Sequence, residues 1–204
     1  MLSLLQVKYK MIRSVLLCFF IMFVIELGLI AICVGENANT IFFITQFVFI
    51  PLSGSLALNI FNELFGSENS LFLHTFYKGK VEKMYGIYVA IYMIPLSVIC
   101  VVLHFQYREF DIIPAILLLF TQVLLFSVLS LLVFIITSDM NITITLLVIY
   151  LSVELATFGS VRNLIHIFYM NLHEPIIFSN VTHMLVLNIV LGIVGYRFFK
   201  RIVS

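Results

Sequence analysis

Six stretches of this chain are each long and apolar enough to cross a lipid bilayer, and little of the chain lies outside them. A bilayer core of about 30 Å requires roughly 20 apolar residues in a helix. The predicted spans are residues 14–34, 40–61, 85–105, 112–137, 141–160 and 181–199. Runs of this length satisfy their backbone in lipid as helices, not as the short alternating strands of a barrel. The sequence therefore predicts an all-α polytopic membrane protein whose residues 1–204 form one transmembrane domain.

The composition excludes an ordinary soluble domain. Hydrophobic residues make up 63% of the chain and charged residues 10%, whereas about a quarter of a soluble domain is charged. The net charge of +1 does not indicate a nucleic-acid partner, because the charges are divided between the two sides of the membrane. Cys18, Cys33 and Cys100 lie in or at the ends of spans without a C-x-x-C pair, and we interpret them as small buried hydrophobic residues.

The Lys and Arg residues between the spans predict the orientation. With the N-terminus placed inside, nine basic residues fall on the cytoplasmic side and two on the outer side. The cytoplasmic set is Lys8, Lys10, Arg13, Lys78, Lys80, Lys83, Arg197, Lys200 and Arg201, and the outer pair is Arg108 and Arg162. Since cytoplasmic loops carry the excess of basic residues, we expect a multi-pass protein of the cell membrane with both termini in the cytoplasm.

Residues 1–13, with the sequence MLSLLQVKYKMIR, are compatible with an amphipathic helix that lies along the cytoplasmic interface. The polar side of this helix would carry Ser3, Gln6, Lys10 and Arg13, and the apolar side Leu4, Leu5, Tyr9 and Ile12. The alternative is a basic leader that only sets the topology.

The one sizeable cytoplasmic loop, residues 62–83, contains an apolar island between acidic and basic ends. The island consists of Leu71, Phe72, Leu73, Phe76 and Tyr77. A solvated linker would not normally expose such a group. The island therefore either docks as a short helix in a groove on a partner protein or lies at the membrane interface without a partner.

The outer segment, residues 160–180, has apolar patches that are too short to span and are interrupted by Glu174 and Pro175. We expect two short helices that enter the outer leaflet and return. Backbone at that depth must pack on protein or form hydrogen bonds within its own turns. His166, His173 and His183 do not have the spacing of ligands on one helix, and no Cys or Asp joins them, so no metal site is predicted.

The combined layout resembles that of ABC-2-type transporter permeases. It has six spans with both ends inside, an amphipathic N-terminal helix, a docking loop between spans two and three, and a re-entrant outer segment between spans five and six. The local resemblance is strongest at NELFGSENSLFLHTFYKGKVEKMYGIYVAIY. An acidic residue and a glycine there precede a short apolar coupling helix and basic residues. Many members have a proline after that helix, where this chain has Phe76 and Tyr77.

This resemblance implies an exporter subunit driven by a separate ATPase. The small size and the Ile/Phe/Asn-rich composition are similar to permeases of Gram-positive peptide exporters, including those for bacteriocins and phenol-soluble modulins. The chain has no phosphate-binding G-x-x-x-x-G-K-[ST] loop, so it is not expected to be an enzyme or to hold a cofactor, and ATP and Mg²⁺ would bind to the partner. Two permease chains, identical or different, would pair with two ATPase chains. The residues implied in ATPase coupling are Leu71, Phe72, His74, Phe76, Tyr77 and Lys78.

Four residues within spans are candidates for a mechanical or transport role. Glu26 and Glu154 are carboxylic acids at membrane depth, where ionised groups cost at least about 2.5–3.5 kcal/mol. They either line the translocation pathway, which spans one and five border in the resembling family, or are structural acids held by hydrogen bonds. Pro51 and Pro95 interrupt the spans that flank the docking loop. They act either as hinges or as static kinks.

Other classes of membrane protein are alternatives to this interpretation. A rhomboid-type protease requires G-x-S-G, but Pro51 occupies the place of the first glycine. A haem exporter would carry tryptophan, which this chain lacks. The main alternative is the substrate-binding membrane component of an energy-coupling-factor vitamin importer, although the first span has no A-x-x-x-A pattern. A membrane immunity protein without transport activity is a further alternative.

Overall fold

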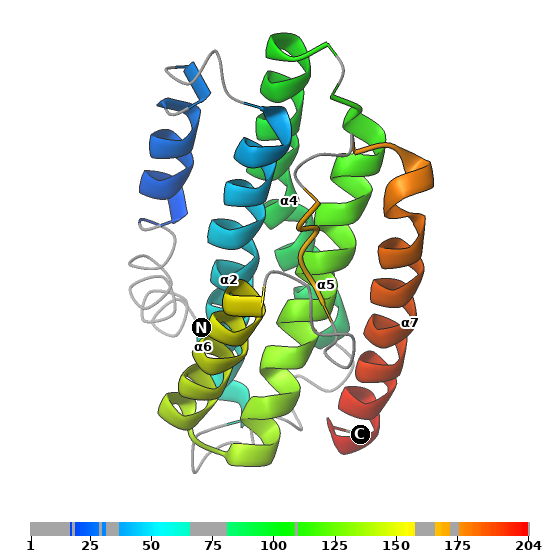
Figure 1. Cartoon of the computed structure of the whole chain (residues 1–204). Helices are drawn as coiled ribbons and strands as arrows, with labels where there is room; N and C mark the ends of the chain where they lie inside the picture. The colour runs from blue at the N-terminus through cyan, green and yellow to red at the C-terminus, as the bar shows by residue number, and fades with distance from the viewer. Residues whose placement is uncertain are drawn as a thin grey trace.

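The computed structural model describes residues 17, 19–28, 30–31, 37–65, 81–108, 110–157, 166–171 and 176–203. These parts of the chain form a helical bundle with no β-strand (Figure 1). A short apolar helix, Phe19–Gly28, comes first. The long helices are α2 (Ala38–Phe65), α4 (Val81–Gln106), α5 (Ile112–Thr137), α6 (Met140–Thr157) and α7 (Phe178–Val203).

The predicted all-helical membrane architecture is confirmed in its coarse form. The five long helices are all long and apolar enough to cross a membrane. Helix α5 has the predicted bounds, whereas α2, α4 and α7 each begin two to four residues before the predicted spans. The first predicted span, 14–34, is described as the helix Phe19–Gly28, so a sixth crossing stays a prediction.

Two predicted elements lie outside the described residues. They are the amphipathic helix at residues 1–13 and the coupling helix that carries Leu71, Phe72, His74, Phe76, Tyr77 and Lys78. Helix α2 ends and α4 begins at the same end of the bundle as the turn between α5 and α6 (Figure 1). The C-terminal end of α7 lies at that end as well.

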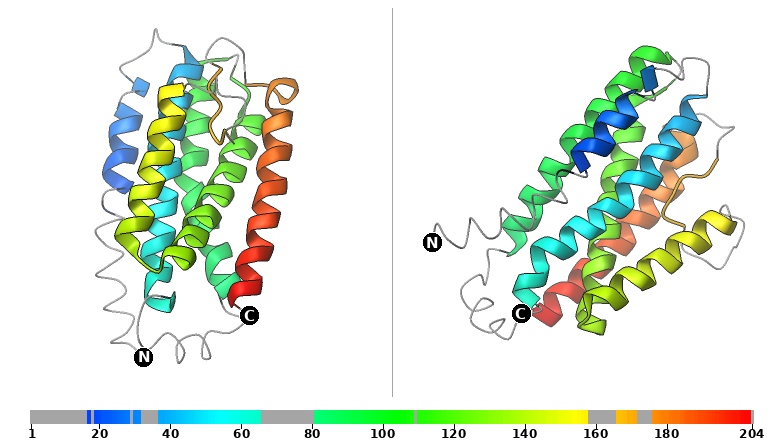
Figure 2. Two further views of the ribbon diagram at one scale, coloured as in Figure 1. Left: turned by 60° about the horizontal axis from the view of Figure 1, so that its bottom comes forward. Right: turned by 90° about the vertical axis from the view of Figure 1, so that its left-hand side faces the viewer.

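Helix α5 forms the centre of the bundle. It buries fourteen side chains and packs against α2, α4, α6 and α7 (Figure 2). The outward stripe of its neighbour α4 consists of exposed Ile87, Ile91, Ile94 and Val98, while Tyr88, Tyr92 and Leu96 face inward and are buried. This arrangement is the one expected in a bilayer, where large apolar side chains on the outer surface contact lipid.

Close backbone approach joins α2 to α5 at Gly54. A Cβ atom at this position would collide with the Ser130 hydroxyl and come within 2.7 Å of the Phe126 ring. Because lipid is as apolar as a leucine side chain, helices in a membrane associate through such close packing rather than through hydrophobic burial. Gly54, between Ser53 and Ser55, therefore provides the point of close contact between α2 and α5.

Tyrosine hydroxyls join α4 to α2 on either side of Pro51. The Tyr92 hydroxyl donates to the Phe49 carbonyl oxygen at 2.5 Å, and the Tyr88 hydroxyl donates to the Ser53 carbonyl oxygen at 2.5 Å. Pro51 and Pro95 lie inside α2 and α4, which continue past them. Their role as hinges stays a prediction, but the two hydroxyl bonds hold α4 against the part of α2 that contains Pro51.

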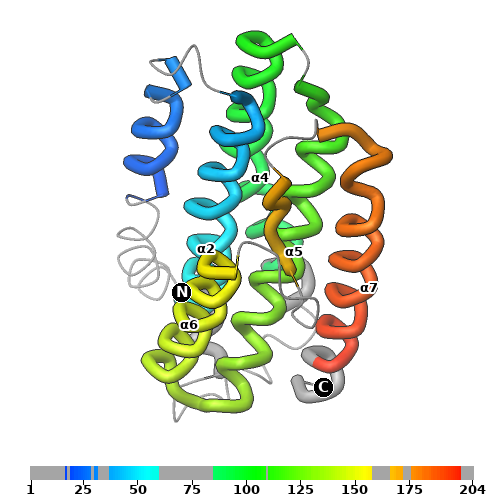
Figure 3. The backbone as a smooth tube through the Cα atoms, in the orientation of Figure 1, coloured from blue at the N-terminus to red at the C-terminus, as the bar shows by residue number. Residues whose placement is uncertain are grey.

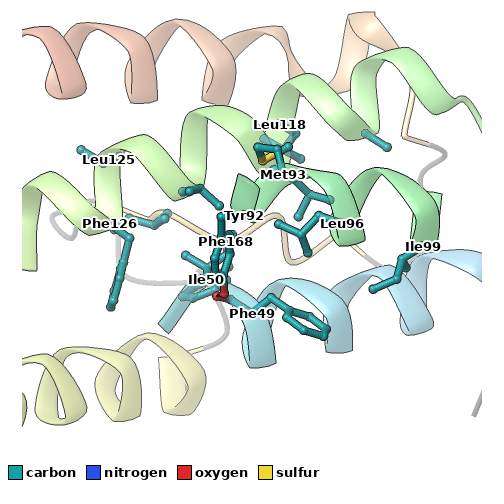
Figure 4. Packing of buried hydrophobic residues seen from close by; sticks show 14 of the residues in the cluster. Phe49, Ile50, Tyr92, Met93, Leu96, Ile99, Leu118, Leu125, Phe126 and Phe168 are labelled. Carbon is teal, nitrogen blue, oxygen red and sulfur yellow. Dashed lines mark hydrogen bonds between the residues drawn. The ribbon is translucent and has the colours of Figure 1, made fainter. Parts of the chain in front are cut away.

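The hydrophobic core extends from the helices to a segment that is not helical. Residues 166–170 have no regular secondary structure, yet Ile167, Phe168 and Tyr169 belong to the buried cluster. Figure 4 shows Phe168 among core side chains from α2 and α5, and its ring centroid lies 5.7 Å from that of Phe47. The two helices expected in the outer segment are thus not present at 166–170. The neighbouring residues 158–165 and 172–175 lie outside the described ranges.

Candidate functional site

The candidate site is the place where residues 166–171 enter the bundle. The segment runs between α2 and α6 on one side and α5 and α7 on the other (Figure 3). An irregular chain in an apolar environment has peptide groups that no helix satisfies, and each unpaired group costs free energy. Side chains from three different helices form hydrogen bonds with peptide groups of this segment.

Glu154 of α6 binds the first part of the segment. Its Oε1 atom accepts hydrogen bonds from the backbone N–H groups of Ile167 at 2.7 Å and Phe168 at 3.0 Å. The Tyr150 side chain forms a further hydrogen bond with this carboxyl group, and His166 Nδ1 lies 4.0 Å from Oε1. Glu154 itself is 1% exposed. A single buried side chain therefore satisfies two consecutive peptide N–H groups.

Gln46 of α2 pairs with the peptide groups of Tyr169. Its Oε1 atom accepts from the Tyr169 N–H at 2.9 Å, and its Nε2 atom donates to the Tyr169 carbonyl oxygen at 3.4 Å. The Gln46 amide thereby forms the two hydrogen bonds with Tyr169 that the backbone of a neighbouring β-strand would form. Gln46 is fully buried, so these bonds form away from lipid and water.

Gln122 of α5 joins the other two anchors. Its Nε2 atom donates both to Gln46 Oε1 and to the Ile167 carbonyl oxygen, each at 2.7 Å. Gln46, Gln122 and Glu154 together bind five backbone N–H and C=O groups of residues 167–169, and we call these three side chains the polar cradle. The hydrogen bonds of the polar cradle to residues 167–169 all go to backbone atoms.

The chemistry of the polar cradle is that of binding and release. Amides and a carboxyl group exchange hydrogen bonds with peptide groups without making or breaking covalent bonds. Among the residues with described positions, no three His, Cys, Asp or Glu side chains gather as metal ligands. The arrangement is suited to holding an extended peptide segment between three membrane helices.

The structure separates the two acids that the sequence singled out. Glu154 belongs to the polar cradle, whereas Glu26 lies between the helix Phe19–Gly28 and α2, where it is bonded to the Thr45 hydroxyl. Gln46 and Gln122 were missed by the sequence analysis. The available signal was a Thr-Gln pair in the middle of two apolar runs, Thr45-Gln46 and Thr121-Gln122. Placing an uncharged amide at membrane depth costs less free energy than placing an ionised acid there, so a glutamine in a span is a weaker indication of a site.

Glu26 is hydrogen-bonded to α2. The Thr45 hydroxyl donates to Glu26 Oε1 and also contacts the Ile41 carbonyl oxygen at 3.1 Å. The other carboxyl oxygen has no hydrogen-bond partner among the described residues, which is unfavourable for an ionised group. We therefore interpret Glu26 as a neutral acid, and its place in a translocation pathway stays a prediction.

We expect Glu26→Gln to leave stability nearly unchanged, because its amide oxygen can still accept the hydrogen bond from Thr45. Glu26→Leu should lower the free energy of unfolding by about 1 kcal/mol through loss of one hydrogen bond. Thermal melting of the detergent-solubilised variants measures both effects. A strong loss of stability in Glu26→Gln would contradict the neutral-acid arrangement and indicate an ionised Glu26.

Comparison of the chain with protein-family models, curated proteins and solved structures gives no match.

Proposed function

We propose that this chain is the transmembrane permease subunit of an ATP-binding cassette exporter of the ABC-2 type. It would move an amphipathic or hydrophobic peptide out of the cell. The observation that carries the proposal is the non-helical segment 166–171, which connects the fifth and sixth predicted spans and is held inside the bundle by the polar cradle. A chain that only anchors another protein has no need for three buried polar side chains around an irregular segment, since each such group costs free energy unless it is paired.

The polar cradle suits a peptide exporter in its chemistry. It already binds peptide groups of a non-helical segment through hydrogen bonds to backbone atoms. Backbone contacts of this kind would accept peptides of different sequence, while the apolar residues nearby would accept their hydrophobic side chains. The substrate in this proposal is therefore a peptide whose backbone exchanges hydrogen bonds with Gln46, Gln122 and Glu154 during passage.

Helix α2 provides the connection to the ATPase. Gln46 lies in its first half, and the helix continues nineteen residues further to Phe65, a distance of about 28 Å at 1.5 Å per residue. The docking loop follows directly. The bonds of Tyr88 and Tyr92 to α2 couple α4, on the other side of that loop, to the same movement. A displacement imposed on the loop would therefore reach the polar cradle through two joined helices.

The remaining parts of the proposal follow from the layout. A separate ATPase subunit binds ATP and Mg²⁺ and contacts the coupling residues Leu71, Phe72, His74, Phe76, Tyr77 and Lys78. A second permease chain, identical or different, completes the transporter in the cell membrane, with both termini in the cytoplasm. The apolar outer faces of the helices support the lipid bilayer as the surrounding medium.

The test is the association of this chain with an ATP-binding cassette subunit. We expect such a subunit to co-purify with the wild-type chain, and Phe72→Asp combined with Phe76→Asp to abolish co-purification and transport-coupled ATP hydrolysis. The double variant should still insert into the membrane, because the loop is not part of a span.

Ser67→Asp combined with Ser70→Asp is the matched control, since it adds two charges to the same loop without removing an aromatic ring. This control should keep the ATPase bound. Retained binding and ATP hydrolysis in the phenylalanine double variant would argue for an interfacial turn and against docking. Absence of any ATPase from the wild-type preparation would overturn the proposed function itself.

A further inference from the structure

Helix α6 packs less closely against α5 than α2 or α7 does. It buries three side chains, Thr143, Leu147 and Glu154, whereas α5 buries fourteen. Large apolar residues such as Ile149 and Leu155 are exposed along its length. The right-hand view of Figure 2 shows α6 diverging from α5 with distance from the turn that joins them. Packing alone therefore holds the far end of α6 weakly.

The near end of α6 is held firmly by a short turn. Ser138 adopts the left-handed conformation with φ of 55° and donates its N–H to the Phe134 carbonyl oxygen at 2.8 Å. The Asp139 carboxylate accepts from the N–H groups of Asn141 at 2.7 Å and Ile142 at 3.1 Å, which caps the first turn of α6. The base of the helix thus has a defined position and few residues in which to bend.

The far end of α6 is held by Glu154 and its bonds to Ile167 and Phe168. Glu154 lies fifteen residues beyond Asp139, about 22 Å along the helix axis. A rotation of about 10° at the base would move Glu154 by roughly 4 Å. A displacement of this size breaks the hydrogen bonds of Glu154 to the segment. A small movement at the turn is therefore sufficient to separate Glu154 from the segment.

We propose that α6 is a hinged helix, with the turn of Ser138 and Asp139 as the hinge and Glu154 as a latch that closes its far end onto residues 166–169. Opening the latch uncovers the N–H groups of Ile167 and Phe168. Those groups then need another acceptor, either water or the carbonyl oxygens of a peptide. Opening is thus favoured when such a ligand enters between α6 and the segment. This inference does not depend on the ATPase proposal, because it concerns the isolated chain.

The test is a distance measurement between spin labels on the isolated chain in lipid nanodiscs. Leu155 on α6 and Ile113 on α5 are both exposed and are replaced by labelled cysteines after Cys18, Cys33 and Cys100 have been changed to alanine. Ile113 paired with exposed Ile189 on α7 is the control pair. Glu154→Leu should add a second population at the Leu155 pair, displaced by more than the width of the wild-type distribution, and leave the control pair unchanged.

Glu154→Gln is the matched variant, because its amide oxygen can still accept both N–H bonds, and it should give the wild-type distribution. A wild-type distribution in Glu154→Leu would overturn the latch, and an equal change at both label pairs would also overturn it by indicating general loosening. If Glu154→Leu does not fold, Tyr150→Phe decides, since it removes the hydroxyl that bonds both to Glu154 and to the Ile167 backbone and so weakens the attachment of α6 to the segment. Broadening at the Leu155 pair alone then supports the latch, and an unchanged distribution refutes it.

Discussion

Gln46→Leu is expected to lower the free energy of unfolding by about 2–5 kcal/mol. The substitution keeps a side chain of similar size but removes the acceptor of the Tyr169 N–H and the donor to the Tyr169 carbonyl oxygen. It also removes one acceptor of Gln122. These groups lie inside a membrane bundle where water does not replace the lost bonds, so each unpaired group retains most of its desolvation penalty.

Two further variants test whether the loss of any buried amide has the same effect as the loss of Gln46. Asn188→Leu removes another buried amide, but among the described residues the hydrogen bond of Asn188 is a long one of 3.5 Å to Thr121 Oγ1 on α5. We expect this change to cost less than about 1 kcal/mol. Gln46→Glu keeps the acceptor oxygen and should fall between Gln46→Leu and wild type. Equilibrium unfolding in mixed micelles measures all three, and equal costs for Gln46→Leu and Asn188→Leu would contradict the role assigned to the polar cradle.

Gly54→Ala is expected to destabilise the protein by about 3 kcal/mol through overpacking. The added Cβ atom would lie 2.7 Å from the Phe126 ring and in collision with the Ser130 hydroxyl, both on α5. Both neighbours are buried in the central helix, so relief of the collision requires α2 and α5 to move apart. Since their contact also sets the spacing between Gln46 and Gln122, the variant should weaken the polar cradle as well.

Gly86→Ala is the control for the change of residue type within a helix. No atom lies within 4 Å of a Cβ built at Gly86, and alanine is favoured over glycine in a helix by roughly 1 kcal/mol. This variant should therefore be neutral or slightly stabilising. Relative to wild type, the melting temperature should fall for Gly54→Ala and should stay the same or rise slightly for Gly86→Ala. A Gly54→Ala variant as stable as Gly86→Ala would show that α2 and α5 do not need close approach.

The export proposal and the latch proposal both concern the polar cradle. The export proposal needs a peptide-binding surface that can be vacated, and the latch proposal states which helix moves to vacate it. They can nevertheless fail separately, because the label distances concern the isolated chain and the co-purification concerns the docking loop. A working latch without an ATPase would describe a hinged membrane protein of another class, such as the importer component or the immunity protein.

The sequence singled out one residue of the polar cradle, Glu154, but did not predict how the three residues come together. Glu154 was identified because an acid at membrane depth is costly and therefore needs a reason. Gln46 and Gln122 carried a weaker signal of the same kind. Nothing in the local sequence indicates that these three residues meet, since the bonds join Gln46 to Gln122 across 76 residues and Gln46 to Tyr169 across 123 residues.

The sequence by itself determined the class of the protein and the long helices. Hydrophobicity is a property of consecutive residues and helices satisfy their own backbone, so runs near the length of a bilayer determine where helices form before any tertiary contact is known. Only the tertiary structure decided the conformation of residues 166–170, which lie in the outer segment where two short helices were expected. Their peptide groups are paired by side chains from α2, α5 and α6, and because those partners are distant in the chain, their contribution becomes available only when the helices have packed.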